Sequence, residues 1–240
     1  MYANTVIDYT GGISIFLVIL VLSGQIERRD AAMFMLRVAQ LDAREATLKL
    51  AATEDSRSVA TLDWLRALGS VLKAIPIERA TGPYEQWLKT HEDLIVYSEP
   101  SGEWLIRHDL IADLHKQFAN RPVAEELAWF AATNGLPGEC EGYVPCYASI
   151  LNTLYGEYLQ RYPRGAHRDQ ALAGINETLL IVVDDLLKRP DRADFLSVPQ
   201  DCGDLLASLR PLRAAVAGAN AAKTETMGLI DQLVAHCPAR

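Results

Sequence analysis

Apolar side chains recur every three or four positions along most of the chain, with polar residues between them. This is the spacing of an α-helix that buries one face. Proline, glycine and short polar stretches divide the pattern into helix-sized segments. The expected helices cover residues 30–52, 58–75, 83–94, 104–118, 123–133, 145–162, 168–187, 204–217 and 224–236.

Residues 97–102 are expected to form a turn, and no segment shows the sustained period-two alternation of a half-buried strand. The sequence therefore predicts an all-α protein. Because short turns join the helices, we expect stacked antiparallel helix hairpins, arranged as a short solenoid or a helical bundle.

Residues 12–24 break the amphipathic pattern, since only Ser14 and Ser23 interrupt a run of glycine and apolar residues. A run of about a dozen residues is short for a bilayer core of about 30 Å, but it matches the apolar region of a signal peptide. The preceding segment carries Asp8 and no Lys or Arg, so a short membrane anchor and a buried core element remain alternatives. We expect a signal peptide or anchor over residues 1–24 and one helical domain over residues 25–240.

The chain has four cysteines, an even number that favours disulfides in an exported protein. Three pairings are possible. Cys140 and Cys146 lie in a loop rich in Gly and Pro, which suits a local bridge, and Cys202 and Cys237 would meet at the open end of a terminal hairpin over residues 201–237. The five-residue spacer between the first two does not match common zinc motifs. These cysteines predict a periplasmic or secreted protein.

Composition argues against nucleic-acid binding. Half of the residues are apolar, and 23 Lys and Arg face 31 Asp and Glu, for a net charge of -8. Binding to phosphates requires a basic surface that this composition does not indicate. No phosphate-binding loop, dinucleotide fingerprint or nucleophile elbow occurs, and we expect no cofactor and no metal.

One stretch suggests an internal repeat. Its large and small residues follow the order Tyr155, Tyr158, Leu159, Tyr162, Ala171 and Ile175. This order resembles a tetratricopeptide repeat, although Leu159 replaces the usual glycine. Residues 158–167 resemble in particular the repeats of bacterial envelope proteins involved in outer-membrane assembly and Tol-Pal coordination.

A second, degenerate repeat precedes the first. Its Ala124 lies 47 positions before Ala171, about 13 more than the usual period of 34 residues. We interpret the cysteine loop, residues 134–145, as an insertion between the two. The resemblance covers residues 104–178, and it implies a scaffold that binds a protein or peptide and has no catalytic residues.

The cysteine loop also carries the candidate partner-binding residues. Tyr143 and Tyr147 lie close in sequence to Glu139 and Glu141, a combination suited to a bound peptide or glycan. We therefore expect a non-enzymatic scaffold with a protein or peptide partner. Contact with a membrane is expected only through residues 12–24, if they are not removed.

The alternative function is a small hydrolase or ligand-binding enzyme built on a helical bundle. His108 and His115 are seven positions apart and so share one helical face. They, or His91, would act with Glu125 or Glu126. However, carboxylates at a helix N-terminus are also explained by the helix dipole alone. This alternative predicts that two of these side chains meet within about 3 Å in a pocket.

Overall fold

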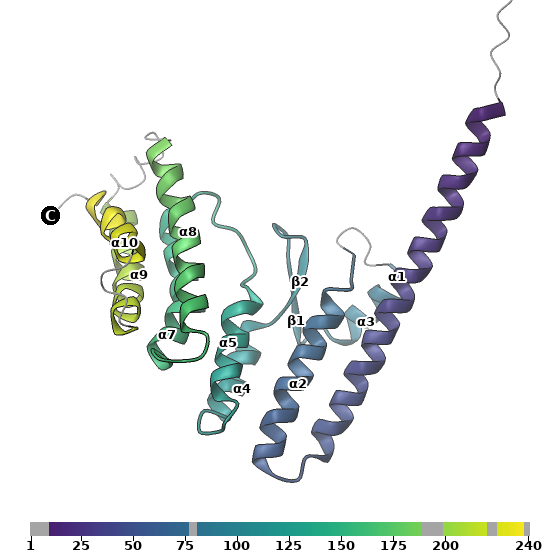
Figure 1. Cartoon of the computed structure of the whole chain (residues 1–240), viewed down its shortest axis with the longest axis horizontal. Helices are drawn as coiled ribbons and strands as arrows, with labels where there is room; N and C mark the ends of the chain where they lie inside the picture. Colours follow the sequence, from purple (N-terminus) through teal and green to yellow (C-terminus); the bar gives the residue numbers. More distant parts are fainter. Residues whose placement is uncertain (1–9, 77–80, 189–198, 220–224, 238–240) are drawn as a thin grey trace, which may run out of the picture.

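The computed structural model describes residues 10–76, 81–188, 199–219 and 225–237, and gives only the backbone course of residues 10–28. The described part of the chain is mostly helical, with one two-stranded sheet, which confirms the predicted fold class (Figure 1). Its elements, in chain order, are α1 (Thr10–Leu50), α2 (Glu54–Leu72), α3 (Pro83–Thr90), β1 (Ile95–Ser98), β2 (Glu103–Ile106), α4 (His108–Gln117), α5 (Ala124–Asn134), α6 (Val144–Leu151), the π-helical η1 (Asn152–Gly156), α7 (Glu157–Arg161), α8 (Arg168–Lys188), α9 (Pro199–Gly218) and α10 (Glu225–Ala235).

Helix hairpins lie side by side in a row (Figure 1). α1 packs on α2 and α4 packs on α5, each with its neighbour in sequence. In the C-terminal half, α6 packs mainly on α9, and α8 packs mainly on α10. Corresponding helices of successive hairpins are therefore stacked on one another there.

α5 separates two hydrophobic cores. Leu127 belongs to the core formed with α1 to α4 and the two strands. Ala128 and Ala132 belong to the core formed with α6 to α10. A helix with apolar residues on two sides is buried on both, so the packing of either half depends on α5.

Two helix starts differ from the prediction. α1 passes through Asp30, which was expected to cap a helix. α2 begins at Glu54 rather than at Ser58, because Thr53 and Ser56 form a capping box that satisfies backbone N–H groups at the helix start.

The predicted helix over residues 104–118 is wrong in its first turn. Residues 103–106 form β2, which pairs antiparallel with β1, and Ile95 lies opposite Ile106. The turn between the strands spans residues 99–102 and ends at Gly102, whose φ of 65° favours glycine. Strands of four residues are too short for an alternating pattern to stand out in the sequence.

The N-terminal prediction for residues 1–24 is largely outside the described part of the chain. Residues 1–9 are not described, and only the helical course of the rest is. Within the described residues, no helix combines the length and apolar character needed to cross a membrane.

Both predicted disulfides are confirmed. The Cα atoms are 5.4 Å apart in Cys140–Cys146 and 5.6 Å apart in Cys202–Cys237, within the usual range. Gly138 and Gly142 both have positive φ, at 96° and 83°, and allow the first loop to close tightly. Two disulfides indicate an oxidising, extracytoplasmic environment.

We predict unequal losses of stability when the bridges are removed. Closing the 35-residue separation of Cys202 and Cys237 restricts the unfolded chain more than closing the six-residue separation of Cys140 and Cys146. Replacing both cysteines of a bridge by serine should cost about 4 kcal/mol in the first case and about 2 kcal/mol in the second. Urea unfolding monitored by circular dichroism measures both, and an equal or reversed order would contradict the prediction.

Gly174 provides a second stability prediction. A Cβ atom at this position of α8 would lie 2.7 Å from the Tyr155 ring of η1, whereas one at the exposed Gly228 of α10 would meet nothing within 4 Å. Gly174→Ala should therefore lower the free energy of unfolding by about 1–3 kcal/mol. Gly228→Ala, the matched control, should raise it by about 0.5–1 kcal/mol through helix propensity. Thermal unfolding of the two variants checks the sign of each change.

Candidate functional site

A groove of about 900 Å³ opens between α2, β2 and the C-terminal half of α5, with α1 contributing at its edge. We call it the cationic groove and define it by its charged and aromatic lining, Arg37, Arg66, Lys73, Glu103, Trp104 and Phe130. Three of these side chains are basic and one is acidic, although the whole chain has a net charge of -8. The groove is thus locally opposite in charge to the molecule as a whole.

The end of α2 positions two of the cations. Arg37 of α1 reaches across and donates from Nη1 to the Ser70 carbonyl oxygen, at 2.6 Å. Lys73 is the C-cap residue of α2 and is exposed. Cations are favourable at a helix C-terminus, where backbone carbonyls lack helical partners. Among the described residues, no carboxylate pairs with Arg37 or Lys73.

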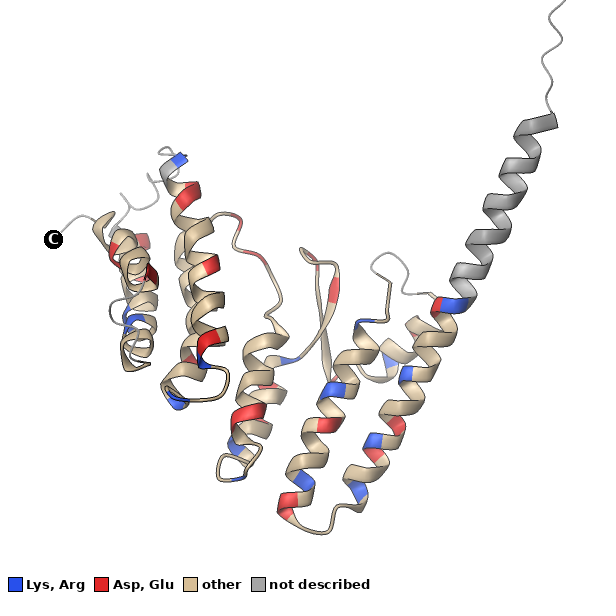
Figure 2. Ribbon diagram, in the orientation of Figure 1, with Lys and Arg blue, Asp and Glu red and all other residues tan. Residues whose placement is uncertain are grey.

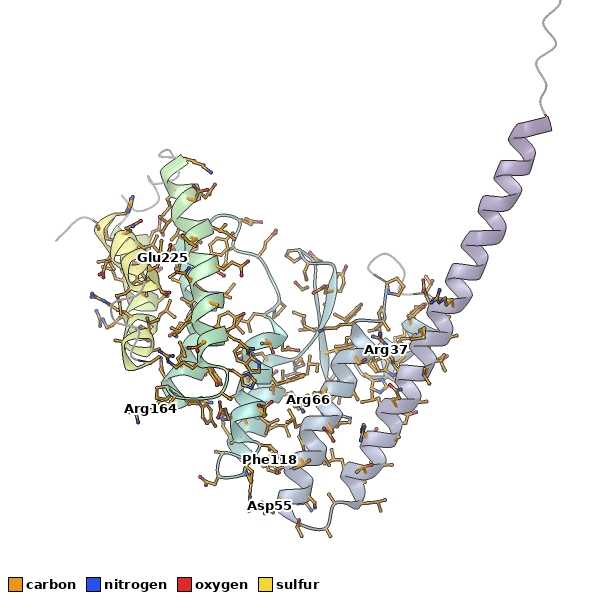
Figure 3. The ribbon with its side chains drawn as sticks, in the orientation of Figure 1. Arg37, Asp55, Arg66, Phe118, Arg164 and Glu225 are labelled. Atoms are coloured by element: carbon orange, nitrogen blue, oxygen red, sulfur yellow. A yellow bond between two sulfur atoms is a disulfide. The ribbon has the colours of Figure 1, made fainter. Side chains whose placement is uncertain are left out.

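Arg66 differs from the other two cations because a carboxylate neutralises it. Its Nη2 lies 2.8 Å from Oε2 of Glu126, on α5. Figure 3 shows Arg37 and Arg66 on the neighbouring helices α1 and α2, and Figure 2 marks the positions of basic and acidic residues along the ribbons of these helices. This ion pair links the helix on one side of the groove to the helix on the other.

Apolar surface accompanies the charges. Trp104 of β2 and Phe130 of α5 are both half-buried. The Trp104 ring packs against Tyr97 of β1, with 5.0 Å between centroids. The groove therefore offers aromatic surface next to cations.

The outer edge of β2 faces the groove. The Arg107 N–H donates to the Leu94 carbonyl oxygen at 2.9 Å, so these two residues form a hydrogen-bonded pair of the hairpin. In antiparallel strands, such pairs alternate with pairs that share no hydrogen bond. Ile106, opposite Ile95, and Trp104, two residues earlier, belong to the pairs that share no hydrogen bond. Their backbone N–H and C=O groups therefore point away from β1. The Asn134 side chain meets that edge by donating to the Ile106 carbonyl oxygen at 2.6 Å. The backbone N–H and C=O of Trp104 thus point away from β1, and Trp104 and Asn134 both line the groove.

A polar network surrounds the N-terminus of α5. Oε1 of Glu125 accepts hydrogen bonds from the Tyr158 hydroxyl at 2.7 Å and from the Ala166 N–H at 2.5 Å. The Tyr158 oxygen also accepts from the His167 N–H at 3.0 Å. Burial, together with the hydrogen bond to Glu125, strongly raises the pKa of Tyr158. Glu125 thus joins α5 to α7 and to the turn before α8.

His167 completes this network on the side of Glu126. Its Nε2 lies 2.7 Å from Glu126 Oε1, its Nδ1 lies 3.0 Å from Gln170 Oε1, and its ring stacks on Trp129 at 4.7 Å. Partial burial disfavours the protonated ring of His167. The hydrogen bonds to Glu126 and Gln170 outweigh this effect, so the pKa of His167 is raised. Both ring nitrogens face oxygen atoms, which suits the doubly protonated ring.

His115 has the opposite character. Its Nδ1 accepts a hydrogen bond from Arg161 at 2.7 Å, and its Nε2 lies 3.1 Å from the Tyr162 hydroxyl. Burial, followed by the charge of Arg161, lowers the pKa of His115. His108 lines the same small cavity of about 30 Å³, and burial lowers its pKa too. The two histidines therefore share a face, as their spacing predicts.

The two glutamates that the alternative enzyme function would use lie apart from His108 and His115. Glu125 and Glu126 bind Tyr158, Arg66 and His167, as described above. His91 stacks on Trp87 at 4.1 Å, at the end of α3. Among the described residues, no hydrogen bond joins His91, His108 or His115 to either glutamate, and no group of three or more His, Cys, Asp or Glu could hold a metal ion.

None of the four residues predicted to bind a partner lines the cationic groove, and Glu139 lines a separate hollow with Tyr97. Tyr143 is half-buried and donates to Asp201 at 3.0 Å, and burial raises its pKa. Tyr147 packs against the C-terminal core and lines a hollow of about 200 Å³ with Ile181. Glu139 and Glu141 are exposed on the loop.

The lining of the cationic groove was not anticipated from the sequence. Arg37, Arg66 and Lys73 belong to two helices, so no short motif unites them. The sequence signal for this site was the presence of two basic residues, Arg66 and Lys73, on either side of Gly69 and Ser70. His167 was likewise missed, because it follows the Pro163–Gly165 turn and has no neighbour in sequence that indicates its partner.

No family model, curated protein or solved structure matches this chain. The resemblance to tetratricopeptide repeats over residues 104–178 therefore stays a prediction from the residues. The function of the cationic groove has to be inferred from its own chemistry.

The raised pKa of His167 predicts a stability that depends on pH. The protonated ring is favoured in the folded state, so its contribution is complete below the ordinary pKa of about 6.5 and is lost as the pH rises through the raised pKa. His167→Gln should lower the free energy of unfolding by about 1 kcal/mol at pH 5.5 and by less at pH 8.5. Urea titrations at both pH values measure the difference between wild type and variant.

The control for this prediction is His236→Gln, which removes an exposed histidine whose Nδ1 meets only the Gln232 carbonyl oxygen. Because this side chain is exposed, its replacement should cost no more than about 0.5 kcal/mol at either pH. His108 and His115 have lowered pKa values and act in the opposite direction, so the comparison is made between variants. Equal losses at pH 5.5 and pH 8.5 for His167→Gln would contradict the assignment.

Proposed function

We propose that the chain is a non-enzymatic helical scaffold of the cell envelope or the secretome, and that it binds a segment of a protein partner in the cationic groove. The observation that supports this proposal is the groove itself, which has a volume of about 900 Å³ and places half-buried Trp104 and Phe130 beside basic side chains. Binding sites typically combine apolar walls with a few polar groups that fix orientation. Aromatic and arginine side chains contribute most to such interfaces.

The packing of the helices supports a scaffold built from repeats. α6 stacks on α9 and α8 on α10, so corresponding helices of successive hairpins meet. Stacked hairpins of this kind present extended surfaces on which partners bind. The resemblance of residues 104–178 to tetratricopeptide repeats is part of this proposal.

The two disulfides support a location in the periplasm or outside the cell. Within this proposal, residues 1–24 act as the signal peptide or as a short anchor. Neither role affects the groove, which begins at Arg37.

A groove-filling variant tests the proposal. Thr133 is exposed, lines the groove, and donates its hydroxyl to the Trp129 carbonyl oxygen one turn earlier. The oxidised full chain would be used to select binders from a phage library of random dodecapeptides. Thr133→Trp should weaken the selected peptides at least tenfold, measured by fluorescence polarisation, because the indole occupies their site.

Thr90→Trp is the matched control. Thr90 is also exposed at a helix end, and its hydroxyl also donates to a carbonyl oxygen one turn earlier, that of Trp87 on α3, outside the groove. This variant should leave binding unchanged. If no peptide is selected, or if both variants bind the selected peptides as well as wild type does, the proposed function is wrong.

A further inference from the structure

We infer that the partner segment is an extended acidic peptide, with carboxylates that pair with Arg37 and Lys73 and an apolar side chain against Trp104 and Phe130. This inference rests on the proposed function and specifies its ligand. Three features of the groove support this ligand: its charge, its aromatic surface and the outer edge of β2.

The charge of the groove favours a ligand with carboxylates. Arg66 is paired with Glu126, but Arg37 uses only a backbone carbonyl and Lys73 has no carboxylate partner among the described residues. Glu103 is the single acidic residue of the lining, and it is exposed. An acidic ligand would therefore find two cations that have no carboxylate partner among the described residues, and a basic ligand would be repelled by both.

The net charge of the chain strengthens this selectivity. At -8, the molecule as a whole repels acidic partners at long range. An acidic segment would gain attraction in the groove, where basic residues outnumber acidic ones. Complementary charge placed in this way gives specificity in addition to affinity.

The edge of β2 favours an extended conformation. The backbone N–H and C=O of Trp104 point away from β1, and Asn134 occupies the Ile106 carbonyl at the end of the same edge. An added strand would satisfy these groups by β-augmentation. Its alternate side chains would point to one face, so carboxylates and apolar side chains that alternate along the peptide would separate onto opposite faces.

The experiment compares three fluorescein-labelled decapeptides that alternate Asp and Val, Asn and Val, or Lys and Val. The full chain should bind the Asp-Val peptide at least tenfold more tightly than the Asn-Val peptide at about 0.05 M salt. The preference should shrink at 1 M salt, where charges are screened within about 3 Å. The Lys-Val peptide should bind most weakly.

Two charge-reversal variants locate the effect. Lys73→Glu should remove about tenfold from the affinity for the Asp-Val peptide and little from that for Asn-Val. Arg164→Glu is the control, because Arg164 is exposed in the turn before α8, away from the groove (Figure 3), and makes the same change of charge. It should leave the preference intact. An equal loss in both variants would show a general effect of net charge and overturn the inference.

The outcomes separate the inference from the proposed function. If library-selected peptides bind in the groove, as judged by Thr133→Trp, but carry no excess of Asp and Glu and do not distinguish Asp-Val from Asn-Val, the acidic ligand is wrong and the scaffold proposal stands. If Thr133→Trp affects no peptide, both are wrong. Self-association of the full chain that Thr133→Trp abolishes would identify a second copy as the occupant and overturn the inference.

Discussion

The structure depends on α5, which is buried from two directions. Leu127 packs into the N-terminal core and Ala128 into the C-terminal core, so a single turn of helix joins them. The adjacent carboxylates of Glu125 and Glu126 extend this role to the surface. One holds the turn before α8, and the other links α2 to His167.

The position of the cationic groove follows from α5. Its C-terminal half, with Phe130 and Asn134, forms one wall, and the ion pair between Arg66 and Glu126 fixes α2 as the other. The β-hairpin is held between them because Ile106 is buried and its carbonyl accepts from Asn134. The same helix that divides the core thus also sets the shape of the groove. The candidate binding surface consequently lies on helices and the β-hairpin rather than on the cysteine loop.

Periodicity predicted most of the fold, because each helix buries one regularly spaced face. It placed α5 and α8 within about one residue of their observed bounds and indicated the hairpin that brings Cys202 to Cys237. The β-hairpin escaped prediction since its strands are only four residues long. The residues of the candidate site were harder to predict than the β-hairpin. Arg37 and Lys73 come together only through the packing of α1 on α2, and aromatic residues near the cysteines drew attention to Tyr143, which instead binds Asp201.

The bridge between Cys202 and Cys237 has a consequence for the local opening of the hairpin formed by α9 and α10. In a linear array of helix hairpins, single units can open while their neighbours stay folded. Here α9 and α10 are tied covalently to each other at their open end. Local opening of this hairpin is thereby restricted to separation of the two helices as one unit from α6 and α8.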